Sequence, residues 1–257
     1  MPGTEVGHPI NVAVQPVGTL LSVEALDAWY GAAQVLRRVS LNIGRGEVIA
    51  LMGRNGAGKS TTLKAIMGLV MHQATKLMFM DRNCQGLRPF EMARMGMGYV
   101  PEERRIFTDL TVEENLRLGR QSARRWPDGE PAAFWSEEDL YRLFPPLDPL
   151  RGRAAGTLSG GEQQMLTVAR TLMGNPFLLL LDEPSEGVAP IVVEQMGAMI
   201  QTLKAHGTSI LLSEQNIPFA RSVADRAYVL EKGVIRYSGS MADLLDDEQL
   251  HRQYLTL

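Results

Sequence analysis

The sequence contains very little cysteine: Cys84 is the one thiol among its 257 residues. A single cysteine excludes an internal disulfide and any metal site built from cysteines. The four histidines do not have the spacing of a metal site. An excess of positive charge is also absent, since the formal net charge is −3 at pH 7. Proteins that bind nucleic acid usually present a basic face, so we do not expect DNA or RNA as a partner.

Long apolar runs are absent as well. The longest, such as 48–52 and 177–181, are far shorter than the ~20 residues that a membrane-spanning helix needs. Residues 1–20 lack the basic start and apolar block of a signal peptide. We therefore expect the chain to stay in the cytoplasm and to reach a membrane only through a partner. Its composition, 45% hydrophobic and 21% charged, is typical of a folded globular protein.

The order of predicted strands and helices favours an α/β fold with a mostly parallel sheet, because the two alternate throughout the second half. Residues 1–20 contain three prolines and three glycines and are expected to form a flexible tail. Residues 21–257 are expected to form one domain, with a β-rich start and a helical subdomain inserted at about 90–157. The expected strands are 21–30, 35–43, 47–52, 76–80, 97–100, 177–181, 208–212 and 226–230, with one more after a turn at 231–233. The expected helices are 59–69, one beginning after Thr111, 136–144, 159–173, 190–204 and 216–223.

A glycine-rich segment follows the third predicted strand and fits the phosphate-loop pattern G-x-x-x-x-G-K-[ST]. Glycines let backbone N–H groups turn towards phosphates, and the helix that follows presents its positive N-terminus to the same anion. Lys59 is expected to contact the β- and γ-phosphates, and the Ser60 hydroxyl to ligate Mg²⁺. A chance glycine-rich turn is the alternative, and the strand before and the helix after this segment disfavour it. The residues expected to bind ATP here are Gly53, Arg54, Asn55, Gly56, Ala57, Gly58, Lys59, Ser60 and Thr61.

The second motif is acidic and follows the apolar run 177–181. Asp182 ends this predicted strand and is expected to hold Mg²⁺ through water, while Glu183 is expected to orient and polarise the attacking water. Phosphoryl transfer depends on such positioning and charge neutralisation more than on covalent chemistry. An Asp-Glu-Pro sequence that merely ends a strand is the alternative, and the phosphate loop disfavours it.

The segment Leu158-Ser159-Gly160-Gly161-Glu162-Gln163-Gln164 lies between these motifs. Together the three resemble the ATP-binding cassette family, the nucleotide-binding subunits of ABC transporters, from about residue 20 to the end. The resemblance implies a P-loop (RecA-like) core with an antiparallel β subdomain. It also implies that Ser159, Gly160, Gly161 and Glu162 bind the γ-phosphate of ATP held by the opposite subunit, and that Tyr30 stacks on adenine.

Two of these assignments have local alternatives. Tyr30 also fits an ordinary strand aromatic. The stretch from Ser159 to Glu162 also fits a helix capping box, although a capped helix N-terminus is itself a place where an anion binds well.

Three positions depart from the general cassette pattern. Glu102 stands where a glutamine is usual, Gln215 stands for the switch histidine, and the loop 185–190 lacks the usual aspartate. Glu102 could serve Mg²⁺ as a ligand or water anchor, and Gln215 can donate to a γ-phosphate but cannot become cationic. These variants together resemble the F-type ATP-binding subunit of branched-chain amino-acid importers. A related urea-importer subunit shares much of this pattern but has glutamine at the first position.

The resemblance implies the motor subunit of an importer for branched-chain or other hydrophobic amino acids, with ATP and Mg²⁺ as cofactors. Two cassettes would close head-to-tail around two ATP molecules. The expected partners are a second ATP-binding subunit of the G type, which makes a heterodimer, two membrane permease subunits and, indirectly, a substrate-binding protein. The expected location is the cytoplasmic face of the membrane. The alternatives are a subunit of a urea or amide importer, and a soluble cassette ATPase of the cluster-assembly type.

Overall fold

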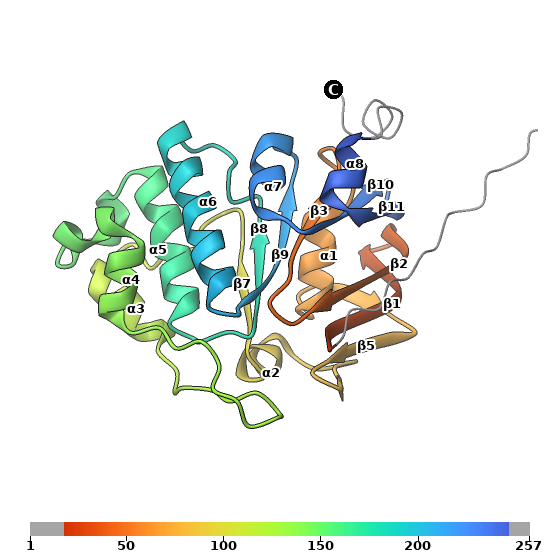
Figure 1. The fold of residues 1–257 in the computed structure, drawn as a ribbon, viewed down its shortest axis with the longest axis horizontal. Coiled ribbons are helices and arrows are strands. Elements are labelled where there is room, and N and C mark those ends of the chain that lie inside the picture. Colours follow the sequence, from red (N-terminus) through yellow and green to blue (C-terminus); the bar gives the residue numbers. More distant parts are fainter. Residues whose placement is uncertain (1–17, 247–257) are drawn as a thin grey trace, which may run out of the picture.

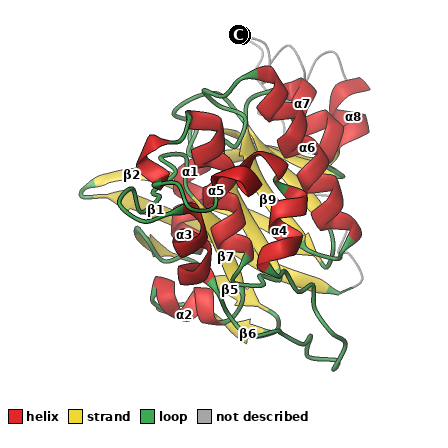
Figure 2. Ribbon diagram, turned by 90° about the vertical axis from the view of Figure 1, so that its left-hand side faces the viewer, coloured by secondary structure: helices red, strands yellow, loops and turns green. Residues whose placement is uncertain are grey.

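The computed structural model describes residues 18–246, and the expected tail at 1–20 therefore lies largely outside the described residues. Two sheets make up the framework, and α1 lies between them (Figure 1). Figure 2 looks onto the helical side, where α3, α4 and α5 stand in front of the strands. No helix within residues 18–246 is long and apolar enough to cross a membrane.

The larger sheet has six strands in the order β11-β10-β3-β9-β8-β7. All neighbours in it are parallel except β10 and β11, which form an antiparallel pair at one edge. The mostly parallel core is thereby confirmed. Its strands are β3 (Val48–Met52), β7 (Met97–Val100), β8 (Leu178–Asp182), β9 (Ser209–Glu214), β10 (Arg226–Glu231) and β11 (Val234–Ser240).

The smaller sheet is antiparallel throughout and has the order β2-β1-β5-β6, with β4 also paired to β1. It confirms the expected antiparallel β subdomain. The two short strands β4 and β6 were not predicted, because runs of two or three exposed or half-exposed residues carry no period-2 pattern. The strands are β1 (Thr19–Tyr30), β2 (Ala33–Gly44), β4 (Met71–Gln73), β5 (Lys76–Phe79) and β6 (Arg82–Asn83).

The central strands are buried on both faces, which explains their unbroken apolar runs. Successive side chains of a strand point to opposite faces, so each strand contributes to two cores. Ile49 and Leu51 of β3 pack with α1 and the smaller sheet. Val48, Ala50 and Met52 pack with the helices on the other face. Because the central strands are buried on both faces, the ends of β3, β8 and β9 are held in place. The residues of the candidate site lie at these ends.

Within residues 18–246, the six helices of seven or more residues match the six expected ones, and three of them begin with a capping box. The sequence predicts two of these capping boxes, at Thr111 and Ser159. Thr111, Ser136 and Ser159 each accept a hydrogen bond from the N–H three residues later, and the acidic side chain there accepts one in return. The helices are α1 (Lys59–Ile66), α2 (Pro89–Arg94), α3 (Val112–Gly119), α4 (Glu137–Leu143), α5 (Gly160–Leu172), α6 (Pro190–Ala205), α7 (Ile217–Val223) and α8 (Met241–Asp246), with short 3₁₀ turns at Pro145–Leu150 and Ala155–Thr157.

Two boundaries differ from the sequence prediction. Strand β7 falls inside the stretch 90–157 that was assigned to a helical insert, yet it pairs with β8 in the core sheet, so residues 97–100 belong to the core. Helix α1 ends at Ile66 instead of residue 69, because Gly68 adopts φ 72 and its N–H bonds to Ala65.

Candidate functional site

The phosphate loop runs from the end of β3 to the start of α1, as the sequence predicts. Two of its glycines are required by close approach. A Cβ on Gly53, which has φ 150, would lie 2.4 Å from the carbonyl oxygen of Leu230, and one on Gly58, with φ 109, would lie 2.8 Å from Leu36. Gly56 also has a positive φ of 78, but nothing lies within 4 Å of its Cβ position. The loop is therefore held tightly at its two ends and is open in the middle.

Lys59 is the first residue of α1, and its side chain is only 3% exposed. Its ammonium group donates to the carbonyl oxygens of Gly53 at 2.9 Å and Arg54 at 3.3 Å. It also lies 2.9 Å from Oε1 of Glu183, which is 6% exposed. A buried cation is thus shared between the phosphate loop and the acidic residue that follows β8. The sequence predicts both residues, and the structure brings them together.

Asp182 is fully buried at the end of β8, and its carboxylate accepts two side-chain hydrogen bonds. The Ser213 hydroxyl donates to Oδ1 at 2.7 Å, and the Tyr99 hydroxyl donates to Oδ2 at 3.1 Å. Burial, followed by the negative charge of Asp182, raises the pKa of Tyr99 well above its ordinary value, so this hydroxyl remains a donor. The carboxylate is therefore fixed in direction by two neighbouring strands.

Glu183 has a left-handed backbone with φ 46, uncommon for a residue with a side chain. Its N–H donates to both the carbonyl and the hydroxyl oxygen of Ser213, each at 3.1 Å, and this holds the backbone in place. Oε2 of Glu183 is buried and has no hydrogen-bond donor among the described residues. One oxygen of Glu183 is thus held by Lys59, and the other can accept a hydrogen bond from water or from a protonated Glu186 side chain.

Glu102 lies in the exposed loop after β7 and close to these carboxylates. Partial burial, followed by the negative charges of Glu183 and Asp182, raises the pKa of Glu102. The structure therefore gathers Glu102, Asp182 and Glu183 around one region with a single nearby buried cation, Lys59. A concentration of carboxylate charge of this kind favours a bound cation.

The oxygen donors in this region are of the type that Mg²⁺ prefers. Ser60 begins α1 beside Lys59, and Asp182 and Glu102 supply carboxylates. No group of three or more histidine, cysteine, aspartate or glutamate side chains within residues 18–246 is arranged as a metal cage. Mg²⁺ is usually bound by one or two carboxylates together with substrate phosphates and waters.

The sequence reasoning missed Glu186, which follows Glu183 by three residues. The N–H of Glu186 donates to the carbonyl of Glu183, and this turn places the two carboxyl groups together. A hydrogen bond to Glu183, then burial and the charge of Glu183, raises the pKa of Glu186 to about 7. Two ionised carboxylates have no proton to share, so this hydrogen bond exists only while Glu186 is protonated.

Gln215 is exposed in the loop after β9, and its own N–H donates to Oε2 of the buried Glu214. Sequence reasoning selected Gln215 but missed Tyr99, Ser213 and Glu214. These three residues form hydrogen bonds to Asp182, Glu183 and Gln215. The carboxyl ends of parallel strands meet at one edge of a sheet, and ligands bind there. Asp182 of β8 pairs with Ser213 of β9. A search of the sequence for polar residues at the ends of the predicted strands could therefore have identified Tyr99, Ser213 and Glu214.

Residues Ser159 to Glu162 form the start of α5 and are arranged as a capping box. The Ser159 N–H donates to Glu162 at 2.7 Å, and the Glu162 N–H donates back to Ser159 at 3.3 Å. A Cβ on Gly160 would lie 2.7 Å from the Arg104 guanidinium, and one on Gly161 would lie 2.7 Å from Val192. Within residues 18–246, no hydrogen bond or ion pair joins this helix end to Lys59 or Glu183. The local capping prediction is confirmed, and nucleotide binding here remains a prediction.

Tyr30 ends β1 at the tight turn into β2 and is 48% exposed. Its side chain is not among those that line the hollow beside the phosphate loop. This hollow has a volume of about 300 Å³ and is lined by Arg54, Asn55, Gly56 and Ala57 and, from the end of β10, by Leu230, Glu231 and Lys232. The phosphate loop is thus open to a ligand on that side.

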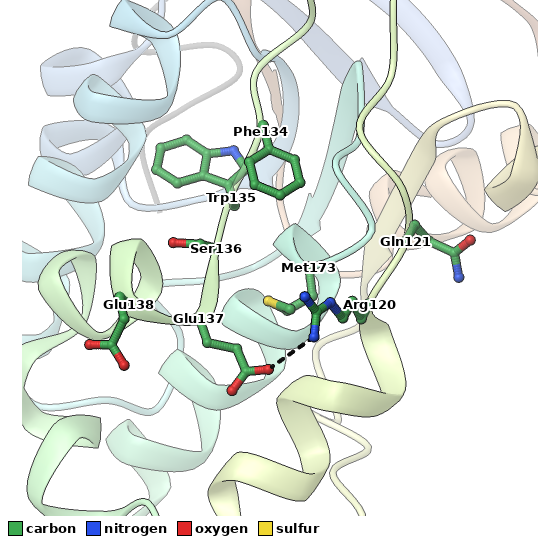
Figure 3. Close-up of a pocket in the computed structure, with 8 residues that line it drawn as sticks. All are labelled: Arg120, Gln121, Phe134, Trp135, Ser136, Glu137, Glu138 and Met173. Atoms are coloured by element: carbon green, nitrogen blue, oxygen red, sulfur yellow. Dashed lines mark ion pairs between the residues drawn. The ribbon is translucent and has the colours of Figure 1, made fainter.

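A second hollow of about 310 Å³ lies in the helical part of the chain and contains none of the predicted site residues. Figure 3 shows its lining, in which Phe134 and Trp135 stand above an ion pair of 3.9 Å between Arg120 and Glu137. This hollow lies at the far end of α5 from Ser159, beside Met173. The predicted site and this hollow are separate features.

Comparison with known proteins agrees with this arrangement. The profile of the family described as ABC transporter matches residues 36–186. The high-affinity branched-chain amino acid transport ATP-binding protein BraG of Pseudomonas aeruginosa is 39% identical over 244 residues, which cover 92% of this chain and 99% of BraG. The lipopolysaccharide export system ATP-binding protein LptB of Escherichia coli (strain K12) is 34% identical over 240 residues, covering 91% of this chain and 96% of LptB.

Solved structures share the fold as well. A nucleotide-free ATP-binding cassette from an ABC transporter superposes with a TM-score of 0.75 at 27% identity, and covers 90% of this chain and 97% of that one. The ADP conformation of MJ1267, an ATP-binding cassette of an ABC transporter, superposes with a TM-score of 0.74 at 26% identity, over 92% of this chain and 98% of that one.

Proposed function

Because the chain belongs to the ABC transporter family and is an ATP-binding cassette with the ATPase activity of that family, we propose that it is the motor subunit of an importer for branched-chain or other hydrophobic amino acids. The observation that carries the motor role is the buried pair of Lys59 and Glu183 at 2.9 Å, at the end of the phosphate loop. The cargo is supported by the likeness to BraG and by the combination of Glu102 and Gln215 in the sequence.

Each residue of the site has its own role in ATP hydrolysis. Lys59 leaves Glu183 for the β- and γ-phosphates when ATP binds along residues 53–61, and this frees the Glu183 carboxylate to accept a hydrogen bond from the attacking water. Gln215 donates to the γ-phosphate. Ser60, Asp182 and Glu102 would hold Mg²⁺, which supplies neutralisation of phosphate charge. Tyr30 stacks on adenine.

The other half of each ATP site comes from a second cassette. Ser159, Gly160, Gly161 and Glu162 bind the γ-phosphate of ATP held by the neighbour, supported by their place at the positive end of the 13-residue helix α5. The neighbour is a G-type subunit, so the pair is a heterodimer. Residues 21–257 act as one ATPase domain, docked at the cytoplasmic face of the membrane on two permease subunits that receive cargo from a substrate-binding protein.

Lipopolysaccharide export is the second candidate. It is favoured by LptB of Escherichia coli and of Haemophilus influenzae, each 34% identical to this chain over most of its length. Cargo contacts lie on other subunits, so the cassette's own site is the same in both cases. Urea or amide import and a soluble cluster-assembly ATPase are less favoured, because the residues around Glu102 and Gln215 match the amino-acid importers better.

Reconstituted uptake separates amino-acid import from urea or amide import and from a soluble ATPase. The chain is co-purified with its membrane subunits, placed in vesicles with ATP inside, and tested for uptake of leucine, isoleucine, valine, amides and urea. We expect uptake of the branched-chain amino acids that requires ATP and is lost in the matched Glu183→Gln complex. Uptake of urea or amides alone, or co-purification without any permease, would contradict the proposal.

A further inference from the structure

Glu214 is a buried carboxylate at the end of β9 with an unusual set of partners. It is 1% exposed, and it accepts hydrogen bonds from three backbone N–H groups. Oε1 accepts from Ser185 at 3.1 Å, and Oε2 accepts from Gln215 at 3.0 Å and Asn216 at 2.9 Å. No arginine or lysine forms an ion pair with it among the described residues. Three donated hydrogen bonds therefore compensate a charge that burial alone would make costly.

These bonds join two loops that are distant in the sequence. Ser185 follows Glu183 by two residues in the loop after β8, whereas Gln215 starts the loop after β9. Ser213, the residue before Glu214, already holds the backbone of Glu183 and the carboxylate of Asp182. Because Glu214 is rigidly placed by β9, with Met52 of β3 as its neighbour in the sheet, a shift of one loop is resisted by the other.

We propose that Glu214 is a positioning residue that ties the loop after β8 to Gln215, so that contact between Gln215 and the γ-phosphate and the placement of Glu183 occur together. This inference rests on the proposed hydrolysis of ATP at this site. In this proposal Glu214 acts through the backbone of Ser185 and Gln215, whose N–H groups donate to its carboxylate. If Glu214 no longer accepts hydrogen bonds from both Ser185 and Gln215, ATP hydrolysis slows while ATP binding at Lys59 stays intact.

Glu214→Gln is the sharpest probe, because it keeps the size of the side chain but replaces one acceptor oxygen with an NH₂ donor. The remaining oxygen keeps the two donors of Gln215 and Asn216 more readily than the single donor of Ser185. The NH₂ group then faces the Ser185 N–H, two donors with nothing to accept. The substitution thus breaks the connection between the loops and leaves each loop otherwise unchanged.

The experiment is a double-mutant cycle of Glu214→Gln and Gln215→Ala in the reconstituted transporter, with kcat measured by phosphate release and ATP affinity by a fluorescent ATP analogue. We expect Glu214→Gln to lower kcat at least 10-fold with the affinity within 2-fold of wild type. In the Gln215→Ala background the same change should lower kcat by less than 2-fold, because the two residues act as one unit. Equal effects in both backgrounds, or an unchanged kcat, would overturn the proposal.

Asp225→Asn is the matched control. Oδ2 of Asp225 accepts a hydrogen bond from the Val48 N–H at 3.0 Å, at the opposite end of β3, so this change also removes an acceptor from the core sheet. We expect a lower melting temperature with an unchanged kcat. The Glu183→Gln complex distinguishes a failure of the proposed function from a failure of the role proposed for Glu214. If it hydrolyses ATP normally, the proposed function fails, whereas a silent Glu214→Gln beside an inactive Glu183→Gln overturns only the tie.

A measurement on the wild-type protein keeps the proposal falsifiable if Glu214→Gln does not fold. Amide hydrogen exchange is followed in the segments 183–188 and 213–217 with and without Mg²⁺ and AMP-PNP, a slowly hydrolysed ATP analogue. We expect both segments to become protected together. Protection of one segment alone, or of neither, would overturn the proposal.

Discussion

The ammonium group of Lys59 lies 2.9 Å from Oε1 of Glu183, and both side chains are more than nine-tenths buried. Each residue therefore neutralises the charge of the other in a place where either alone would be costly. In the proposed function this contact breaks during hydrolysis, because Lys59 moves to the phosphates and Glu183 accepts a hydrogen bond from the attacking water. In the same proposal, ATP replaces Glu183 as the partner of Lys59.

The first prediction concerns the closed end of the phosphate loop. Gly53→Ala places a methyl group 2.4 Å from the carbonyl oxygen of Leu230 at a φ of 150, which side chains rarely adopt. The loop must move away from β10 to accept it. We expect at least a 10-fold loss of ATP affinity and a loss of about 1–3 kcal/mol in the free energy of unfolding. Titration with a fluorescent ATP analogue and urea unfolding measure the two effects.

Gly56→Ala provides the control for this change within the same loop. Its φ of 78 is also positive, but no atom lies within 4 Å of the added methyl group. We expect only the backbone cost, about 1 kcal/mol, and a smaller loss of affinity than for Gly53→Ala. If the two variants lose equal affinity, the close approach of Leu230 is not what shapes the loop.

The second prediction is a pH dependence of stability from Glu186, measured without nucleotide or Mg²⁺. In the folded protein, contact with Glu183 raises the pKa of Glu186 from its ordinary value of about 4.5 to about 7. Between these two values the folded state holds a proton that the unfolded state has released, so stability falls as pH rises through this window. Glu102 adds to the rise and Lys59 opposes it.

Glu186→Gln removes this titration. We expect the melting temperature of wild type minus that of Glu186→Gln to decrease from about pH 4.5 to about pH 7 and to stay constant above it. Thermal unfolding of both proteins across pH 4.5–8.5 gives this difference. A difference that does not change with pH would show that the carboxyl groups of Glu183 and Glu186 do not share a proton.

The third prediction concerns the switch position. Gln215 is exposed, and its backbone is fixed by Glu214. Histidine at this place can donate to the γ-phosphate as glutamine does and can also become cationic. We therefore expect Gln215→His to leave ATP hydrolysis intact or to raise it by up to about 10-fold. Complete loss of phosphate release in this variant, with ATP still bound, would contradict the role given to Gln215.

Much of the fold was predictable because its signals are local. The apolar runs of β3 and β8, the glycines of the phosphate loop and the capping boxes at Thr111 and Ser159 each depend on neighbouring residues only. The sequence also predicts that Lys59 and Glu183 serve the same ATP, and their direct contact is a finding of the structure. Strand β7 was predicted at its observed residues, but the helical insert was drawn from about residue 90, because strand order in the sheet cannot be read from local periodicity.

The supporting residues were not predictable in the same way. Tyr99, Ser213 and Glu214 are ordinary strand residues in the sequence, and their importance arises from the order of strands in the sheet. Asp182 receives its two hydrogen bonds from the strands on either side of β8. The contact between Glu183 and Glu186 depends on the left-handed φ of Glu183, which composition and periodicity do not reveal.

The fourth prediction tests the central claim, that Lys59 and Glu183 form the centre of an ATP-hydrolysing site. Glu183→Gln keeps the shape of the side chain but removes the charge that polarises water. The measurement is phosphate release, together with the amount of ATP retained, by the reconstituted transporter after rapid removal of free nucleotide. We predict a loss of phosphate release of at least about 100-fold (about 2.7 kcal/mol in the activation barrier), with intact ATP retained on the protein. Phosphate release at the wild-type rate would contradict the account.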